Sequence, residues 1–144
     1  MVENLHFDIR TVTLGISLLE CGDPDSKKAA QKIYNKITKT GEHLISTVRN
    51  MEKTYGIPIV NTRVTPISLL DHHYSAEDFL EIAYALDQAA DTLGIDFLGG
   101  FSALIQKGFT RGDLNLIAAI PRALSSTKKV CSSLNVASTK AGIN

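Results

Sequence analysis

The chain has 144 residues, of which 44% are hydrophobic and 21% charged, as is typical of one soluble α/β domain with a real core. Its 15 basic residues balance its 15 acidic residues, which argues against a nucleic-acid-binding surface, because such surfaces carry a basic excess. No apolar run approaches the roughly 20 residues that cross a bilayer, and the first seven residues lack a signal-peptide core. We therefore expect a cytoplasmic protein whose partners include neither nucleic acid nor membrane.

The first predicted strand, residues 9–18, alternates between an apolar and a polar face. The apolar face consists of Val12, Leu14, Ile16 and Leu18. The other face consists of Thr11, Thr13, Gly15 and Ser17. A parallel strand between two helix layers is nearly all apolar, so this alternation predicts a sheet with one wet face.

One long helix is expected after the turn at residues 21–25, with Ser26 as its cap. Its apolar side chains recur at gaps of three, four and seven, which fit one stripe of a helix. They are Ala30, Ile33, Ile37, Leu44, Val48, Met51 and Tyr55. Gly56 is well placed to end this helix, and Pro58 prevents its resumption.

The second predicted strand, residues 59–65, carries a charged side chain on its polar face, and Pro66 is expected to end regular pairing. Val60, Thr62 and Val64 lie opposite Asn61, Arg63 and Thr65. Burying the Arg63 guanidinium without a partner is costly, so it should face a carboxylate or a bound anion. The alternatives are an ion pair with an acidic residue such as Asp96, or exposure of Arg63 at a strand edge.

A loop at residues 71–74 precedes a helix that begins with a capping box at Ser75 and Asp78. His72 and His73 lie in this loop and are expected to be solvated rather than metal ligands. The helix presents one apolar face and ends at Gly94. That face consists of Phe79, Ile82, Ala83, Leu86, Ala90 and Leu93.

The third predicted strand, residues 96–104, contains Gly99 and Gly100. Paired glycines inside a strand usually mark a bulge or the close approach of another group. A loop follows, and Asp113 is expected to cap a further helix. Pro121 either kinks that helix or starts a second one.

The fourth predicted strand, residues 130–136, again has one polar and one apolar face. Cys131, Ser133 and Asn135 point one way, and Val130, Leu134 and Val136 point the other. The Cys131 thiol would be a nucleophile or a radical carrier if its surroundings lowered its pKa or shielded it. The alternative is a small buried residue. Cys131 and Cys21 form neither a metal-spacing motif nor a disulfide framework, so we expect free thiols, no metal and no cofactor.

The order βαβαβαβ predicts parallel neighbouring strands with right-handed crossovers. Four strands cannot close a barrel, and no covering helix follows the last strand. We therefore expect one domain, 1–144, that is a partial α/β barrel with its helices outside and a polar lumen. It would be the N-terminal part of a longer protein, or a unit whose open edge a partner covers.

Five segments together resemble uncharacterised protein family 0210, also called domain of unknown function 711. They are residues 8–19 (DIRTVTLGISLL), 56–61 (GIPIVN), 64–68 (VTPIS), 99–104 (GGFSAL) and 130–133 (VCSS). The family resembles the pyruvate formate-lyase-like superfamily, so the resemblance implies a homodimer and a ten-stranded α/β barrel of two five-stranded halves. This chain would supply about the first half-barrel, as the N-terminal third of a family member. No glycyl-radical motif matches these residues, and the resemblance carries no established reaction.

Two functions from different classes fit this polar stripe. The first is an enzyme that acts on a small polar or anionic metabolite, with Arg63 holding the anion and Cys131 as the reactive group. Hydrogen bonds to the ligand would come from Thr13, Ser17, Thr65, Ser102, Ser133 and Asn135. The second is a non-catalytic ligand-binding or regulatory protein on the same scaffold.

Overall fold

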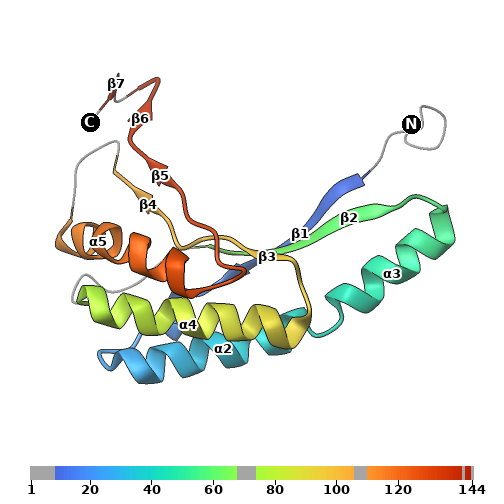
Figure 1. Ribbon diagram of the computed structural model, residues 1–144, viewed down its shortest axis with the longest axis horizontal. Helices are drawn as coiled ribbons and strands as arrows, with labels where there is room; N and C mark the ends of the chain where they lie inside the picture. Colours follow the sequence, from blue (N-terminus) through green and yellow to red (C-terminus); the bar gives the residue numbers. More distant parts are fainter. Residues whose placement is uncertain (1–8, 68–73, 106–109, 141, 144) are drawn as a thin grey trace.

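The computed structural model describes residues 9–67, 74–105, 110–140 and 142–143. It is an α/β structure in which a parallel three-stranded sheet of order β1-β2-β3 has helices packed on one side (Figure 1). The strands are β1 Ile9–Ser17, β2 Ile59–Ile67 and β3 Phe97–Leu98. The predicted parallel pairing is confirmed, and the open sheet is consistent with a partial barrel.

The alternation predicted for β1 is confirmed by its burial. Ile16 and the following Leu18 are buried against the helices, whereas Thr11, Thr13 and Ser17 are exposed on the other side. The sheet therefore has one dry face and one wet face, as the sequence indicated.

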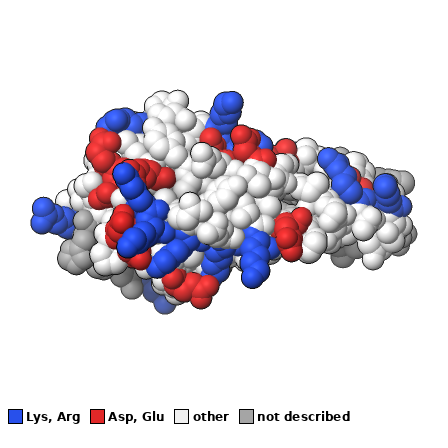
Figure 2. Space-filling model, turned by 90° about the horizontal axis from the view of Figure 1, so that it is seen from below, with Lys and Arg blue, Asp and Glu red and all other residues white. Residues whose placement is uncertain are grey.

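The helical layer contains four α-helices and one short 3-10 helix in the described residues. They are η1 Leu19–Cys21, α2 Ser26–Gly41, α3 Leu44–Tyr55, α4 Ala76–Leu93 and α5 Arg111–Ser126. Helix α2 packs along α4, and α4 packs against α5. Figure 2 shows this side of the molecule, on which basic and acidic side chains are intermixed. None of the described helices is long and apolar enough to cross a membrane.

The single long helix predicted over residues 26–55 is wrong, because the chain forms α2 and α3 with a break at Glu42 and His43. Gly41 lies at the crossing with α4, where a Cβ would come within 2.7 Å of Leu93 Cδ1. After the break α3 leaves this crossing and runs alongside β2 (Figure 1). Tyr55 is consequently 58% exposed rather than part of a buried stripe.

Two predicted helix caps are displaced by one or a few residues. Asp25, not Ser26, caps α2, and its carboxylate accepts a hydrogen bond from the Lys27 N–H at 3.0 Å. Thr110 caps α5, and Asp113 is the reciprocal partner in a capping box. In both cases a neighbouring side chain with the same capping chemistry is the N-cap.

The remaining helix ends agree with the sequence. Ser75 and Asp78 form the predicted capping box of α4. Gly56 and Gly94 end α3 and α4 in the left-handed conformation, with φ of 65° and 71°. Pro121 lies within a single helix, α5, rather than starting a second one.

The predicted third strand is divided by a bulge. Strands β3 and β4, Ala103–Leu104, are separated by Gly100 at φ 94°. Leu98 bridges Val130, whereas Ala103 pairs with Leu134, so the register shifts by one residue between the two pairs. One extra residue on one strand defines a β-bulge, and the prediction from the paired glycines is confirmed.

The fourth strand is shorter than predicted. Only β5, Leu134–Asn135, pairs with β4, and Val130 makes an isolated bridge. The sequence analysis missed the hairpin of β6, Ala137–Ser138, and β7, Gly142–Ile143. Leu134 and Val136 were expected on a buried face but are 41% and 40% exposed, because no described helix packs over β5.

Pro66 does not end β2, which continues to Ile67 and pairs with β1 through the position of Pro66. Strand β3 pairs with β2 only at Arg63 and Val64. On the side that faces β3, the segment around Pro66 is therefore unpaired. A residue without an N–H is tolerated at such an edge.

The core lies between the sheet and the layer of α2, α4 and α5. Its largest fully buried side chains are Phe101, Leu18, Ile33, Ile37, Ile82, Leu86, Ile95 and Leu98. Phe79 contacts Tyr74 and Phe101 edge-to-face, at centroid distances of 5.8 and 6.4 Å. This packing fixes the dry face of the sheet and leaves the opposite face for a site.

Candidate functional site

The strand register gathers several predicted side chains on the wet face of the sheet. Thr13 on β1 is the register partner of Arg63 on β2, which in turn is the partner of Phe97 on β3. Partners in a parallel sheet point to the same face. Thr65 is the partner of Gly15 in the next row of this face, but its side chain lies outside the described residues.

Arg63 is the one of these side chains that reaches across the sheet. It is half-buried, and its guanidinium lies against Gly99, where a built Cβ would come within 3.1 Å of both Cζ and Nε and still closer to Nη2. The close approach of another group, which the paired glycines predicted, is therefore confirmed at Gly99.

Arg63 has no protein partner for its charge among the described residues. Its Nε is buried without a hydrogen-bond partner. The alternative ion pair with Asp96 is wrong, because the Asp96 carboxylate accepts hydrogen bonds from the Thr62 N–H at 2.8 Å and from the Thr62 Oγ1 at 3.1 Å. A half-buried guanidinium whose charge no described residue balances is a candidate site for an anion.

Cys131 lies beside Gly99 in space, on the segment of chain that neighbours β3. Its N–H donates to the Leu98 carbonyl at 2.8 Å, which places Cys131 at the level of Gly99 on the neighbouring strand. The thiol is half-buried, and its Sγ contacts the Lys129 carbonyl at 3.9 Å. Among the described residues no basic side chain bonds to this thiol, so its surroundings provide no activating base.

The remaining predicted site residues fall into separate groups. Ser102 and Ser133 meet, with 3.0 Å between their hydroxyl oxygens, and the Ser133 N–H donates to the Ser102 Oγ at 3.0 Å. Asn135 instead accepts a bond from the Ala137 N–H at 3.4 Å, within its own turn. Ser17 is exposed at the far end of β1. Of the predicted residues whose side chains are described, Arg63 lies against Gly99, Cys131 lies beside Gly99 on the neighbouring segment, and Thr13 is the register partner of Arg63.

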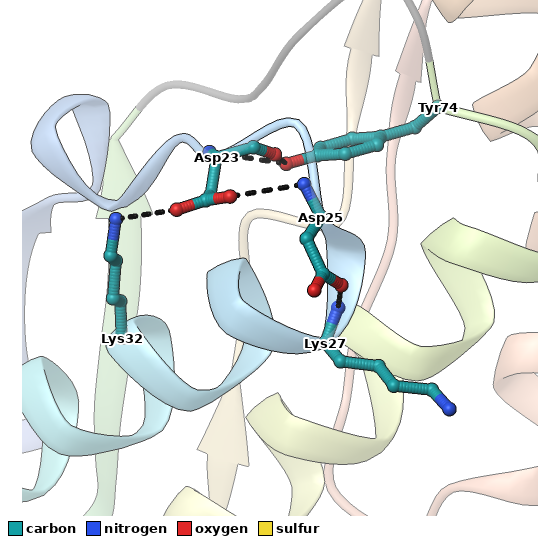
Figure 3. A network of polar contacts seen from close by, with 5 residues as sticks. All are labelled: Asp23, Asp25, Lys27, Lys32 and Tyr74. Atoms are coloured by element: carbon teal, nitrogen blue, oxygen red, sulfur yellow. Dashed lines mark hydrogen bonds and ion pairs between the residues drawn. The ribbon is translucent and has the colours of Figure 1, made fainter.

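The sequence analysis missed a polar network at the carboxyl end of β1 (Figure 3). The Tyr74 hydroxyl donates to the Asp23 carbonyl and accepts from the Asp23 N–H at 3.3 Å. The Asp23 carboxylate pairs with Lys32 at 2.8 Å and accepts from the Asp25 N–H at 3.0 Å. These hydrogen bonds, from Lys32 first, lower the pKa of Asp23.

This network joins the β1–α2 turn to the start of α4. The Asn115 side chain adds α5 through a bond to the Tyr74 carbonyl at 2.8 Å. Aspartates around a proline are a turn signal in the sequence, but nothing there pointed to Tyr74, which is 51 positions from Asp23. Since the polar groups of the network satisfy one another, we assign it a structural role.

Other predicted candidates have no place in a site. Cys21 is buried in the core, and burial raises the pKa of its thiol. His72 and His73 lie outside the described residues. Within the ranges that are described, no three His, Cys, Asp or Glu side chains form a group that would hold a metal ion.

Comparison with known proteins identifies the family. The family model described as Uncharacterised ACR (DUF711) matches residues 1–144. The chain belongs to the DUF711 family. The resemblance drawn from the sequence segments is thereby confirmed.

Curated DUF711 relatives carry the name UPF0210 protein. One from Clostridium botulinum (strain Eklund 17B / Type B) is 59% identical over 146 residues, covering 100% of this chain and 32% of the relative. One from Acetivibrio thermocellus is 57% identical with the same coverage. One from Streptococcus equi subsp. zooepidemicus (strain MGCS10565) is 56% identical and is covered over 33% of its length. The chain thus spans about a third of the length of these relatives.

Proposed function

We propose that the wet face of this DUF711 chain binds a small anionic metabolite, with Arg63 as the partner of the anion. The observation that carries this proposal is the Arg63 guanidinium, which has no partner among the described residues and whose Nε is buried without an acceptor. A guanidinium keeps its charge at all physiological pH values, so it cannot relieve its burial by losing a proton. A bound anion balances this charge.

The neighbours of Arg63 suit a small polar ligand. Thr13 is its register partner and presents an exposed hydroxyl group on the same face. The paired hydroxyls of Ser102 and Ser133 lie further along the β4–β5 edge. Such groups fix the orientation of a ligand by hydrogen bonds while the charge pair supplies affinity.

We further propose that this face lines the lumen of a pyruvate formate-lyase-like barrel in a homodimeric cytoplasmic protein. The wet face is not covered by any described helix, as Figure 1 shows. A closed barrel would shield Arg63 from solvent and salt, and would strengthen its attraction for an anion.

Anion titrations of the 144-residue chain test the role of Arg63. Acetate and inorganic phosphate are added to the wild type and to Arg63→Ala, and binding is followed by NMR chemical shifts. Arg122→Ala is the matched control, because that exposed arginine already pairs with Glu77. We expect Arg63→Ala to weaken binding at least about tenfold, the loss of one charge-assisted pair, and the control to bind as wild type. Unchanged binding in Arg63→Ala would overturn the proposal.

A second candidate function, thiol catalysis, is favoured by the place of Cys131 beside Gly99. An enzyme predicts that Cys131 reacts with iodoacetamide faster than a free model thiol at neutral pH, and that a bound anion protects it. A purely binding protein predicts an unreactive thiol, with anion affinity unchanged in Cys131→Ser. The labelling rate therefore separates the two functions.

A further inference from the structure

Gly99, the residue directly after β3, is the position over which the Arg63 guanidinium lies. We infer that Gly99 is a positioning residue that sets which edge of this guanidinium a ligand meets, and that the site takes an oxyanion presenting two oxygens together. The inference rests on the proposed function, since it specifies the ligand of the same site.

The first step is the space above Gly99. A Cβ built at this position would come within 3.1 Å of Arg63 Cζ and Nε, and closer still to Nη2. Any residue with a side chain would therefore push the guanidinium away from the backbone at this position. Gly99, unlike Gly100, is not among the glycines with positive φ, so its backbone does not itself require glycine. The need for glycine comes from Arg63.

The second step is the environment of the three guanidinium nitrogens. Nε is buried and has no acceptor. Nη1 and Nη2 also lack a protein partner but are not among the fully buried atoms of the described structure. The side edge, Nε with one terminal nitrogen, is therefore closed to a ligand, whereas the end edge, Nη1 with Nη2, is open.

The third step is the ligand that fits an end edge. The two parallel N–H groups of Nη1 and Nη2 match two oxygens of one carboxylate or phosphate group. A monatomic anion presents one acceptor atom to both N–H groups, so it cannot give each of them a separate, linear hydrogen bond. The shared chemistry of the ligand is thus an oxyanion with two accessible oxygens.

Substitution of Gly99 tests the assignment. In Gly99→Ala the atoms that must move are the end of a flexible side chain, so the fold should be retained while Arg63 is displaced. We expect acetate binding to weaken about tenfold, as for loss of a bidentate pair. Gly22→Ala is the control, because a Cβ there would make an ordinary contact of 3.7 Å with the Leu19 carbonyl; it should bind as wild type.

A double-mutant cycle distinguishes this role from a general effect on packing. In an Arg63→Lys background the guanidinium is gone, so Gly99→Ala should change acetate affinity by less than about twofold. Wild-type acetate affinity in Gly99→Ala alone would overturn the inference. It would also be overturned if Gly99→Ala weakened acetate binding by the same factor in the Arg63→Lys background as in the wild type. If Arg63→Ala itself retained binding, the proposed function would fail, which is a separate outcome.

Two measurements on the wild type stand even if Gly99→Ala does not fold. Chloride at the same concentration should not displace acetate or inorganic phosphate, and equal competition by chloride would overturn the two-oxygen assignment. Hydrogen exchange of the Arg63 Nε–H should be slower than that of exposed Arg122. Equal exchange rates would contradict a closed side edge.

Discussion

Replacement of Asp96 by alanine should destabilise the fold without disturbing the proposed anion site. The Asp96 Oδ2 accepts hydrogen bonds from the Thr62 N–H and the Thr62 Oγ1, at 2.8 and 3.1 Å. Thr62 is only 6% exposed, so both donors lose their acceptor in a largely dry environment. Hydrogen bonds to a charged group contribute about 1.5–3 kcal/mol each.

The expected loss is smaller than the sum of the two bonds, because Asp96 itself is exposed and water can replace part of its carboxylate. We expect the free energy of unfolding to fall by about 2–3 kcal/mol in Asp96→Ala. Asp96→Asn should lose less, since it keeps an acceptor oxygen. Urea unfolding followed by far-UV circular dichroism measures both.

A loss below about 0.5 kcal/mol in Asp96→Ala, the range of ordinary surface substitutions, would refute this reasoning about Thr62. Acetate binding provides the second readout. Because Asp96 is occupied by Thr62 and not by Arg63, the alanine variant should bind acetate as wild type. A change in affinity would show that Asp96 competes for Arg63 after all.

Three further predictions follow from other parts of the fold. The Ile59 N–H and then Arg49 lower the pKa of Glu52 below its ordinary 4.5, so its contribution to stability is present above pH 4.5 and is lost as the pH falls through the lowered value. As the pH is lowered, Glu52→Gln should therefore lose less of its free energy of unfolding than the wild type. Identical dependence of this free energy on pH in the two proteins would contradict the prediction. In the native chain iodoacetamide should label Cys131 before Cys21, whose pKa burial raises, and mass spectrometry of partly labelled protein would expose the reverse order. Leu86→Ala, at a fully buried position of α4, should lower the free energy of unfolding by about 2–5 kcal/mol in the urea assay, and a loss under 1 kcal/mol would mean that this core is loosely packed.

Those parts of the fold that depend on local chemistry were predictable from the sequence. The polar and apolar faces of β1 follow from strict alternation, and the start of α4 follows from Ser75 and Asp78. Gly56 and Gly94 end helices because glycine, which has no Cβ, adopts the left-handed conformation at the lowest cost in free energy. Each of these features is decided by residues within one turn or strand.

Features that depend on distant parts of the chain were not predictable. The apolar stripe of α2 continues in period into α3, so periodicity alone gives no sign of the break after Gly41. Gly41, the last residue before that break, lies against Leu93, which belongs to α4. The exposure of Leu134 likewise depends on the absence of a described helix over β5, which alternation within the strand cannot reveal.

The candidate site likewise combines features that were predictable from the sequence with features that were not. The polar face and the charge of Arg63 were visible in the sequence, as was the unusual Gly99–Gly100 pair. Whether Asp96 would neutralise Arg63 depends on the offset between β2 and β3, and that offset directs Asp96 to Thr62. The meeting of Arg63 with Gly99 is set by the same offset.

A crystal structure of the chain with selenate, an oxyanion located by its anomalous scattering, tests the central claim most directly. The account predicts an anomalous peak within hydrogen-bonding distance of Nη1 and Nη2 of Arg63, over Gly99. Selenate at other arginines but not at Arg63, or an Arg63 guanidinium already paired with a carboxylate of the protein, would contradict it.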